Sequence, residues 1–238
     1  MKRSLLAHAP EPTLPYLLMC WLMVIPVFRG LLRGRVTGLG NVPRRGGLVV
    51  VANHGSHLDP PILACALRRP VAFMAKEELF RVPLLGPVIR ACGAYPVARG
   101  ASDRRAVRAA CERIAEDWAT GVFLDGTRQE DGRVNHPHDG AAWLAARMQV
   151  PLLPVAIINS HRALGPGDGR LRLVPVHVRI GTPIPPPVSA RSADVKATTL
   201  ALQAEIHRLL DAGLIRTPRI GAANPPARMA PTSADRGH

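Results

Sequence analysis

The sequence has few aromatic residues and few lysines. Aromatic side chains make up only 4% of the 238 residues, and no basic stretch carries the interleaved rings on which exposed bases stack. We therefore expect no nucleic-acid partner. The formal net charge of +14 comes almost wholly from arginine, because the lysines are only Lys2, Lys76 and Lys196. Such a charge favours anionic surfaces, including the phosphates of a membrane.

Cysteine is also scarce. Cys20, Cys65, Cys92 and Cys111 lie far apart in the sequence, with no CxxC pair and no histidine at the spacing of a metal ligand. This pattern favours reduced thiols in a cytosolic compartment. We expect neither a disulfide nor a bound metal.

The sequence lacks a hydrophobic run long enough to cross a bilayer. Residues 14–28 are uncharged and strongly apolar, but they fall short of the roughly 20 residues that a spanning helix needs. No small-residue cleavage site follows them, which argues against a signal peptide. Because arginines flank the run, we expect residues 1–35 to form a membrane-associating segment that lies in one leaflet. A helix buried in the core is the alternative.

Beyond residue 47, strand-like and helix-like stretches alternate, which predicts an α/β domain over residues 36–215. Helices are expected over residues 103–120, 140–149 and 192–210. Strands are expected over residues 152–158 and 174–180. Pro175 would place the last strand at a sheet edge, because proline cannot donate to the ladder. The tail, residues 216–238, is rich in proline, alanine and arginine and is predicted to be disordered.

Residues 49–60 combine an apolar β-branched run, a polar turn and a helix start. Asp59 suits the N-cap and Pro60 the first helical position. A loop at a helix entrance lets the Asp59 carboxylate turn back to one nitrogen of His54, which fixes the tautomer and leaves the other nitrogen as a base. Taken alone, the spacing equally suits a capping aspartate and a surface histidine. We expect His57, His136, His138 and His161 to be surface or loop residues.

A second block, residues 123–128 (FLDGTR), also ends a strand-like run. Together the two blocks resemble the NHxSxxD and FPEGTR motifs of the 1-acylglycerol-3-phosphate O-acyltransferases, the PlsC-like glycerolipid acyltransferases. Residues 75–80, 93–99 and 150–157 resemble the AKxEL, GxIPVDR and VPIVPVAI stretches of that family. The resemblance implies a mixed, largely parallel sheet flanked by helices, with a helical N-terminal segment on the membrane.

The resemblance also implies the chemistry. His54 would be the general base and Asp59 its orienting carboxylate. A fatty acyl chain would pass from acyl-CoA or acyl carrier protein, a co-substrate, to the hydroxyl of a lysophospholipid, with no cofactor. The acceptor would be 1-acyl-sn-glycerol 3-phosphate, giving phosphatidic acid at the cytoplasmic face of the cell membrane, where the protein would be peripheral or monotopic.

Substrate binding would fall mainly to the second block. Arg128 carries the planar fork that pairs with phosphate oxygens, and Gly126 permits close backbone approach. By resemblance the further substrate-binding residues are Asp125, Thr127, Arg99 and Lys76. A surface arginine is the alternative for Arg99.

Several positions depart from the family motifs. Leu124, Asp125 and Gln129 stand where proline, glutamate and serine are expected, and Ala98 replaces an acid. These changes affect the acceptor side and leave His54 and Asp59 intact. Another lyso-lipid or a polar alcohol is therefore an alternative acceptor, and a catalytically weak lipid-binding homologue is an alternative function.

Overall fold

A single mixed sheet of seven strands organises the computed structural model, which describes residues 14–83, 85–97, 104–166 and 170–212. The strand order is β1-β7-β6-β2-β5-β3-β4. All neighbouring strands pair in parallel except β6 and β7. The strands are β1 (Arg35–Thr37), β2 (Leu48–Ala52), β3 (Val71–Lys76), β4 (Tyr95–Val97), β5 (Ala119–Phe123), β6 (Leu152–Ile158) and β7 (His177–Ile180). The expected α/β fold is confirmed.

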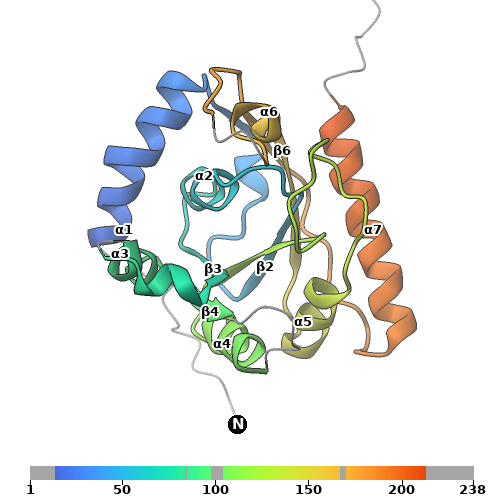
Figure 1. Ribbon diagram of the computed structural model, residues 1–238. Helices are drawn as coiled ribbons and strands as arrows, with labels where there is room; N and C mark the ends of the chain where they lie inside the picture. The colour runs from blue at the N-terminus through green and yellow to red at the C-terminus, as the bar shows by residue number, and fades with distance from the viewer. Residues whose placement is uncertain (1–13, 84, 98–103, 167–169, 213–238) are drawn as a thin grey trace, which may run out of the picture.

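Helices cover both faces of this sheet (Figure 1). On one face lie α2 (Asp59–Ala66) and an N-terminal helix made of α1 (Leu14–Leu18), η1 (Met19–Val24) and η2 (Pro26–Leu31). On the other face lie α4 (Arg104–Ala115), α5 (Gly140–Met148) and α7 (Ser192–Asp211). The shorter elements are η3 (Leu39–Asn41), η4 (Glu77–Arg81), α3 (Leu85–Ala91) and α6 (Ser160–Ala163).

The central strand β2 is apolar at every position because hydrophobic clusters cover both of its faces. Val50 and Ala52 belong to the hydrophobic cluster under α2, whereas Val49 and Val51 belong to the cluster under α4, α5 and α7. Successive side chains of a strand point to opposite faces, so a strand covered on both sides needs apolar residues at every position. The carboxyl end of β2 then delivers residues 53–58 to the edge where ligands of such sheets bind.

Two of the expected elements need correction. The helix expected over residues 103–120 ends at Ala115, because Asp117 adopts a left-handed conformation with φ of 63°. Val107 lies three residues before the buried Ala110, at helical spacing, yet it is 41% exposed. The strand expected from residue 174 begins at His177 and lies between β1 and β6, so it is not an edge strand. Pro175 precedes the ladder and therefore removes no donor from it.

The N-terminal helix is part of the core on one side. Tyr16, Cys20 and Phe28 are 4%, 5% and 3% exposed, and the Tyr16 hydroxyl donates to the Ala64 carbonyl in α2 at 2.8 Å. The helix is underwound into π-type turns at its centre, where Ile25 N–H donates to the carbonyl of Cys20, five residues earlier. Among the described helices, none is long and apolar enough to span a membrane.

Three of the four cysteines, all free thiols, gather where this helix meets the domain. Cys20, Cys65 and Cys92 pack in the cluster that contains α2, and Cys92 Sγ lies 3.5 Å from Met19 Sδ. Burial raises the pKa of the Cys92 thiol to about 11. Within the described ranges no group of three histidine, cysteine or carboxylate side chains is arranged to hold a metal ion.

Candidate active site

His54 and Asp59 meet in the loop between β2 and α2. His54 Nδ1 lies 2.8 Å from Asp59 Oδ2. The same carboxylate oxygen accepts from the backbone N–H groups of Gly55 and Ser56, each at 2.8 Å. Asp59 is fully buried. Three donors on one buried oxygen hold the carboxylate in a single orientation, facing the imidazole.

This geometry corrects the expected capping role of Asp59. The residue is the first in α2, Leu58 precedes it as the N-cap, and Pro60 takes the second helical position. The carboxylate turns back toward the loop, as the dyad interpretation requires. It bonds to backbone N–H groups outside the helix, and no side-chain capping bond is made at Leu58.

The imidazole of His54 is also held by stacking. Its ring lies on the Phe123 ring with centroids 3.9 Å apart and planes 13° apart. Phe123 in turn stacks on Phe73 at 5.8 Å. Since the carboxylate is an acceptor, Nδ1 carries the proton and Nε2 keeps its lone pair. The His54 side chain is 16% exposed, and no described residue hydrogen-bonds to Nε2.

Asn53 was not identified from the sequence as a site residue. Its side-chain N–H groups donate to the carbonyls of Gly132 at 2.7 Å and Ile157 at 2.9 Å, and its oxygen accepts from Ile157 N–H at 2.8 Å. Asn53 is 1% exposed. It thus ties the carboxyl ends of β2 and β6 to the loop after β5. An asparagine next to His54, at the end of an apolar run, is the sequence signal for such a buried, hydrogen-bonded link.

The second block forms the turn after β5. Leu124 N–H donates to the Ala52 carbonyl at 2.9 Å, and Gln129 N–H donates to the His54 carbonyl at 2.7 Å. These bonds fix the block against the dyad loop. Gly126 has φ of 65°, a conformation that glycine adopts without strain.

Asp125 accepts hydrogen bonds from the backbone of the loop that follows this turn. It is 2% exposed, and its two carboxylate oxygens accept from the backbone N–H groups of Asn135 at 3.1 Å and His136 at 2.9 Å. Its carboxylate is therefore committed to holding residues 135 and 136. Thr127 is exposed, and its hydroxyl lies 3.4 Å from Gln129 Nε2.

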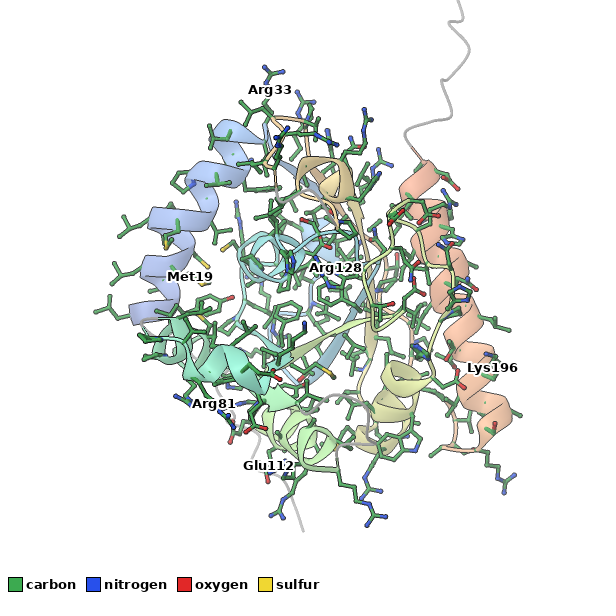
Figure 2. The ribbon with its side chains drawn as sticks, viewed as in Figure 1. Met19, Arg33, Arg81, Glu112, Arg128 and Lys196 are labelled. Atoms are coloured by element: carbon green, nitrogen blue, oxygen red, sulfur yellow. The ribbon has the colours of Figure 1, made fainter. Side chains whose placement is uncertain are left out.

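Two cations, Arg128 and Lys76, act electrostatically on His57, as does His54. Arg128 lies on the turn after β5 (Figure 2), and Lys76 ends β3. The pKa of His57, an exposed side chain, is lowered first by partial desolvation of its ring and then by the charges of Arg128, His54 and Lys76. These groups are therefore close enough to interact. Arg99 lies outside the described residues.

His161 differs from the expected surface histidine. It is half-buried, and its side chain packs against the backbone of Gly55 and Gly132. Burial, followed by the charge of Arg162, lowers its pKa. His57, His136 and His138 are exposed, as expected.

A buried carboxylate facing an imidazole, at the carboxyl ends of parallel strands, is the arrangement that an acid–base site would require. The acyltransferase family model matches residues 33–158, which contain every element of this site. The chain belongs to that family.

Similar proteins agree with this assignment. The chain is 27% identical over 133 residues to the 1-acyl-sn-glycerol-3-phosphate acyltransferase of Borreliella burgdorferi, covering 53% of this chain and 51% of that protein. It is 28% identical over 173 residues to the enzyme of that name from Limnanthes douglasii, covering 70% of this chain and 57% of that protein. The chain thus spans about half the length of the curated relatives it matches.

A solved structure shares the fold. The crystal structure of the 1-acyl-sn-glycerophosphate acyltransferase PlsC from Thermotoga maritima superposes with a TM-score of 0.69 and 24% identity. The match covers 84% of this chain and 88% of that one. The α/β architecture is therefore shared with PlsC.

Proposed function

We propose that the protein transfers a fatty acyl chain from acyl-CoA or acyl carrier protein to the hydroxyl of a lysophospholipid, 1-acyl-sn-glycerol 3-phosphate first among them. The observation that supports this best is the 2.8 Å contact between His54 Nδ1 and Asp59 Oδ2, which leaves Nε2 available. Arg128 and Lys76 supply positive charge nearby. The names of the relatives support the same substrate class.

The chemistry follows from the imidazole. Nε2 of His54 takes the proton of the acceptor hydroxyl as its oxygen attacks the thioester carbonyl. Asp59 stabilises the imidazolium that forms. The tetrahedral intermediate then collapses, the carbon–sulfur bond breaks, and the imidazolium returns the proton to the leaving thiolate. General-base help of this kind contributes roughly 100- to 10,000-fold.

The acceptor's phosphate would lie against Arg128 and Lys76. Arginine offers a planar fork for two phosphate oxygens, and lysine adds a point charge. Neither forms an ion pair with a described acidic residue, so both charges are available to an anionic substrate. Asp125 stays bound to the loop backbone and shapes the site indirectly.

Membrane association would use the outer side of the N-terminal helix. Trp21, Leu22 and Met23 are 65%, 69% and 68% exposed, and this helix lies along the outside of the domain in Figure 2. Leu79 of η4, Val82 in the connection and Leu85 of α3 add partly exposed apolar side chains, and α3 lies next to α1 in Figure 1. With the positive charge, this surface suits an anionic membrane at its cytoplasmic face, bound peripherally or monotopically.

One assay tests the transfer. Purified protein is given labelled acyl-CoA or acyl carrier protein and a panel of lyso-lipids with and without phosphate, and the products are resolved by chain and headgroup. We expect His54→Ala to lose at least about 100-fold in turnover with the fold intact. His136→Ala, at an exposed histidine of the neighbouring loop, is the control. Turnover of the His54 variant within a few-fold of the control would exclude His54 as the base.

A second assay tests the membrane surface. The triple variant Trp21→Ser, Leu22→Ser, Met23→Ser should float less with anionic vesicles, because it loses apolar area without touching the buried side of the helix. Leu200→Ser, at an exposed leucine of α7, is the control. Equal flotation of both variants would assign membrane binding to another surface.

A further inference from the structure

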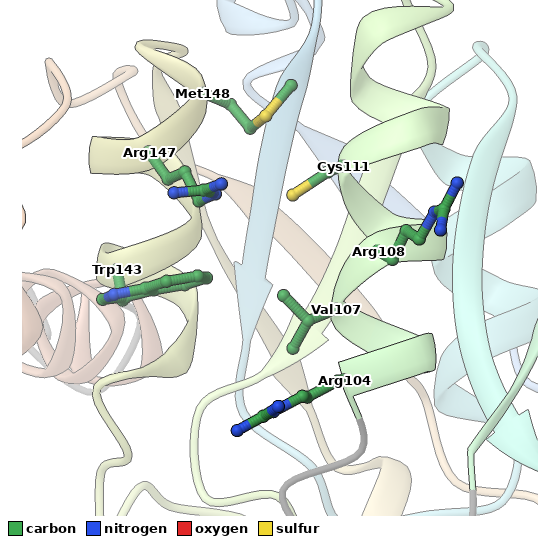
Figure 3. A pocket seen from close by; sticks show the side chains of 7 residues that line it. All are labelled: Arg104, Val107, Arg108, Cys111, Trp143, Arg147 and Met148. Carbon is green, nitrogen blue, oxygen red and sulfur yellow. The ribbon is translucent and has the colours of Figure 1, made fainter.

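A groove separates α4 and α5 on the face of the sheet opposite the N-terminal helix. Its cavity volume is about 760 Å³. Figure 3 shows Val107 and Trp143 facing each other across it, with Met148 near one end and Arg104 at the other. Arg108 and Arg147 complete the basic rim, and no acidic residue lines the groove.

The groove exists because α4 carries more apolar surface than the sheet covers. Ala106, Ala110 and Ile114 pack against the sheet. Val107 lies on a neighbouring stripe and is 41% exposed. The lining of α4 runs from Arg104 to Cys111, roughly 10 Å at about 1.5 Å per residue. Two turns of a partner helix match this length.

The charge of the rim restricts what can fill the groove. Arg147 lies over the Trp143 ring at 5.8 Å, and Arg108 pairs only with the exposed Glu112 of its own helix. The two ends of this chain do not complement such a rim. Residues 1–13 carry two basic side chains against one acid, and residues 213–238 carry four arginines against one aspartate.

A membrane is also a poor occupant. The N-terminal helix packs in the cluster on one side of the sheet, while α4 and α5 pack in the cluster on the other. Figure 1 shows these helices on different sides of the domain. A flat bilayer that contacts the N-terminal helix leaves the groove facing water. The groove therefore suits a water-soluble, acidic partner with an apolar anchor.

We propose that this groove docks an acidic helix of the acyl carrier protein that delivers the donor thioester, an inference that rests on the proposed acyl transfer. An apolar side chain of that helix occupies the space between Val107 and Trp143, and its carboxylates pair with Arg104, Arg108 and Arg147. Arg104 begins α4 at the sheet edge where β5 ends and His54 lies. A carrier seated here presents its thioester arm to that edge.

The test compares two donors and two charge-reversed proteins. The double variant Arg104→Glu, Arg147→Glu is compared with Arg45→Glu, an exposed arginine before β2 that is remote from the groove in the sequence. Each is assayed with acyl carrier protein and with acyl-CoA carrying the same chain. Binding of fluorescently labelled acyl carrier protein is measured by anisotropy.

The double variant should raise KM and Kd for the carrier at least about tenfold, since two attractions become repulsions. Its KM for acyl-CoA and its kcat should stay within about twofold of the parent. Added salt should weaken carrier binding to the parent more than to the double variant. Val107→Glu should also weaken carrier binding, because it places a charge in the apolar part of the groove.

Three results would overturn the proposal. They are a parent that binds no carrier protein, a double variant whose carrier Kd equals that of Arg45→Glu, and an equal loss with both donors. Loss of vesicle binding in the double variant would assign the groove to lipid and overturn it too. If the parent transfers from neither donor yet the variant loses carrier binding, the acyl-transfer function fails while the docking groove is supported.

Discussion

Asp59→Asn removes the charge beside His54 and keeps the shape of the side chain. The backbone N–H groups of Gly55 and Ser56 donate to Oδ2, so the amide oxygen must take that position and still accept from His54 Nδ1. The tautomer is therefore preserved. At the Oδ2 position the variant keeps the hydrogen bonds and loses the negative charge that would stabilise an imidazolium.

The cost can be worked from the contact. With the nitrogen and oxygen 2.8 Å apart, the charge centres lie about 4 Å apart, and their attraction is about 4 kcal/mol at an effective dielectric constant of about 20. Each 1.36 kcal/mol corresponds to roughly tenfold in rate. Because the two backbone donors remain and water relaxes around the site, we expect kcat to fall about 100- to 1,000-fold, with KM nearly unchanged.

The same substitution also lowers stability. The amide NH₂ would take the position of Oδ1, which is buried and has no hydrogen-bond partner among the described residues. An unsatisfied buried donor costs roughly 1–3 kcal/mol in the free energy of unfolding. The assay therefore measures kcat, KM and the denaturation midpoint together, at a temperature where the variant is folded, with Asp131→Asn as an exposed control.

A folded Asp59→Asn protein with kcat within about fivefold of the control would refute this reasoning. The carboxylate would then be a loop anchor, and proton transfer would involve another group. A large rise in the acceptor's KM with unchanged kcat would equally contradict a role confined to the transition state.

Three further predictions follow from contacts around the site. Arg128→Lys should weaken the affinity for phosphate-bearing acceptors by about ten- to a hundredfold, because the fork is lost; equal loss on phosphate-free acceptors would make Arg128 structural. Gly121→Ala should lower turnover and thermal stability, because a Cβ would overlap the Phe73 ring. Phe73 stacks on Phe123, which stacks on His54. Unchanged kinetics would show that this packing does not affect His54. The pKa of His161 is lowered by burial, so the unfolded state binds the proton more tightly and stability should fall as pH drops below about 6.5. His161→Gln should flatten that fall in urea denaturation from pH 7 to pH 5, and an unchanged slope would contradict it.

Much of the architecture follows from local patterns. The strand over residues 152–158 and the helices beginning at residues 140 and 192 start where the sequence places them. These segments have strong hydrophobic periodicity and clear flanking signals. The predicted helix over residues 103–120 is longer than α4, because Trp118 lies four residues after Ile114 and so continues the helical apolar spacing, although it follows the left-handed Asp117 outside the helix. Periodicity alone does not distinguish those two positions.

The dyad was accessible from the sequence because His54 and Asp59 are close neighbours in the chain. The contacts that hold His54 and the loop in place could not be predicted from the sequence, because they come from distant segments. Asn53 bonds to a residue 104 positions away, and Phe123 reaches His54 from a neighbouring strand. Cys20, Cys65 and Cys92 likewise converge only through tertiary packing. No local spacing rule encodes such contacts.

Helix α2 connects the proposed base, His54, to the proposed membrane surface. Its first residue, Asp59, orients His54, and the carbonyl of Ala64 accepts from Tyr16 of the N-terminal helix at 2.8 Å. The buried side of that helix thus contacts the element that carries the carboxylate beside His54, while its exposed side meets the membrane in the proposed function. A lyso-lipid leaving the bilayer would then arrive on the α2 side of the strand ends, and a carrier docked between α4 and α5 would arrive on the other. Since the dyad lies at the strand ends between these two faces, hydroxyl and thioester can approach it from opposite sides without competing for one entrance.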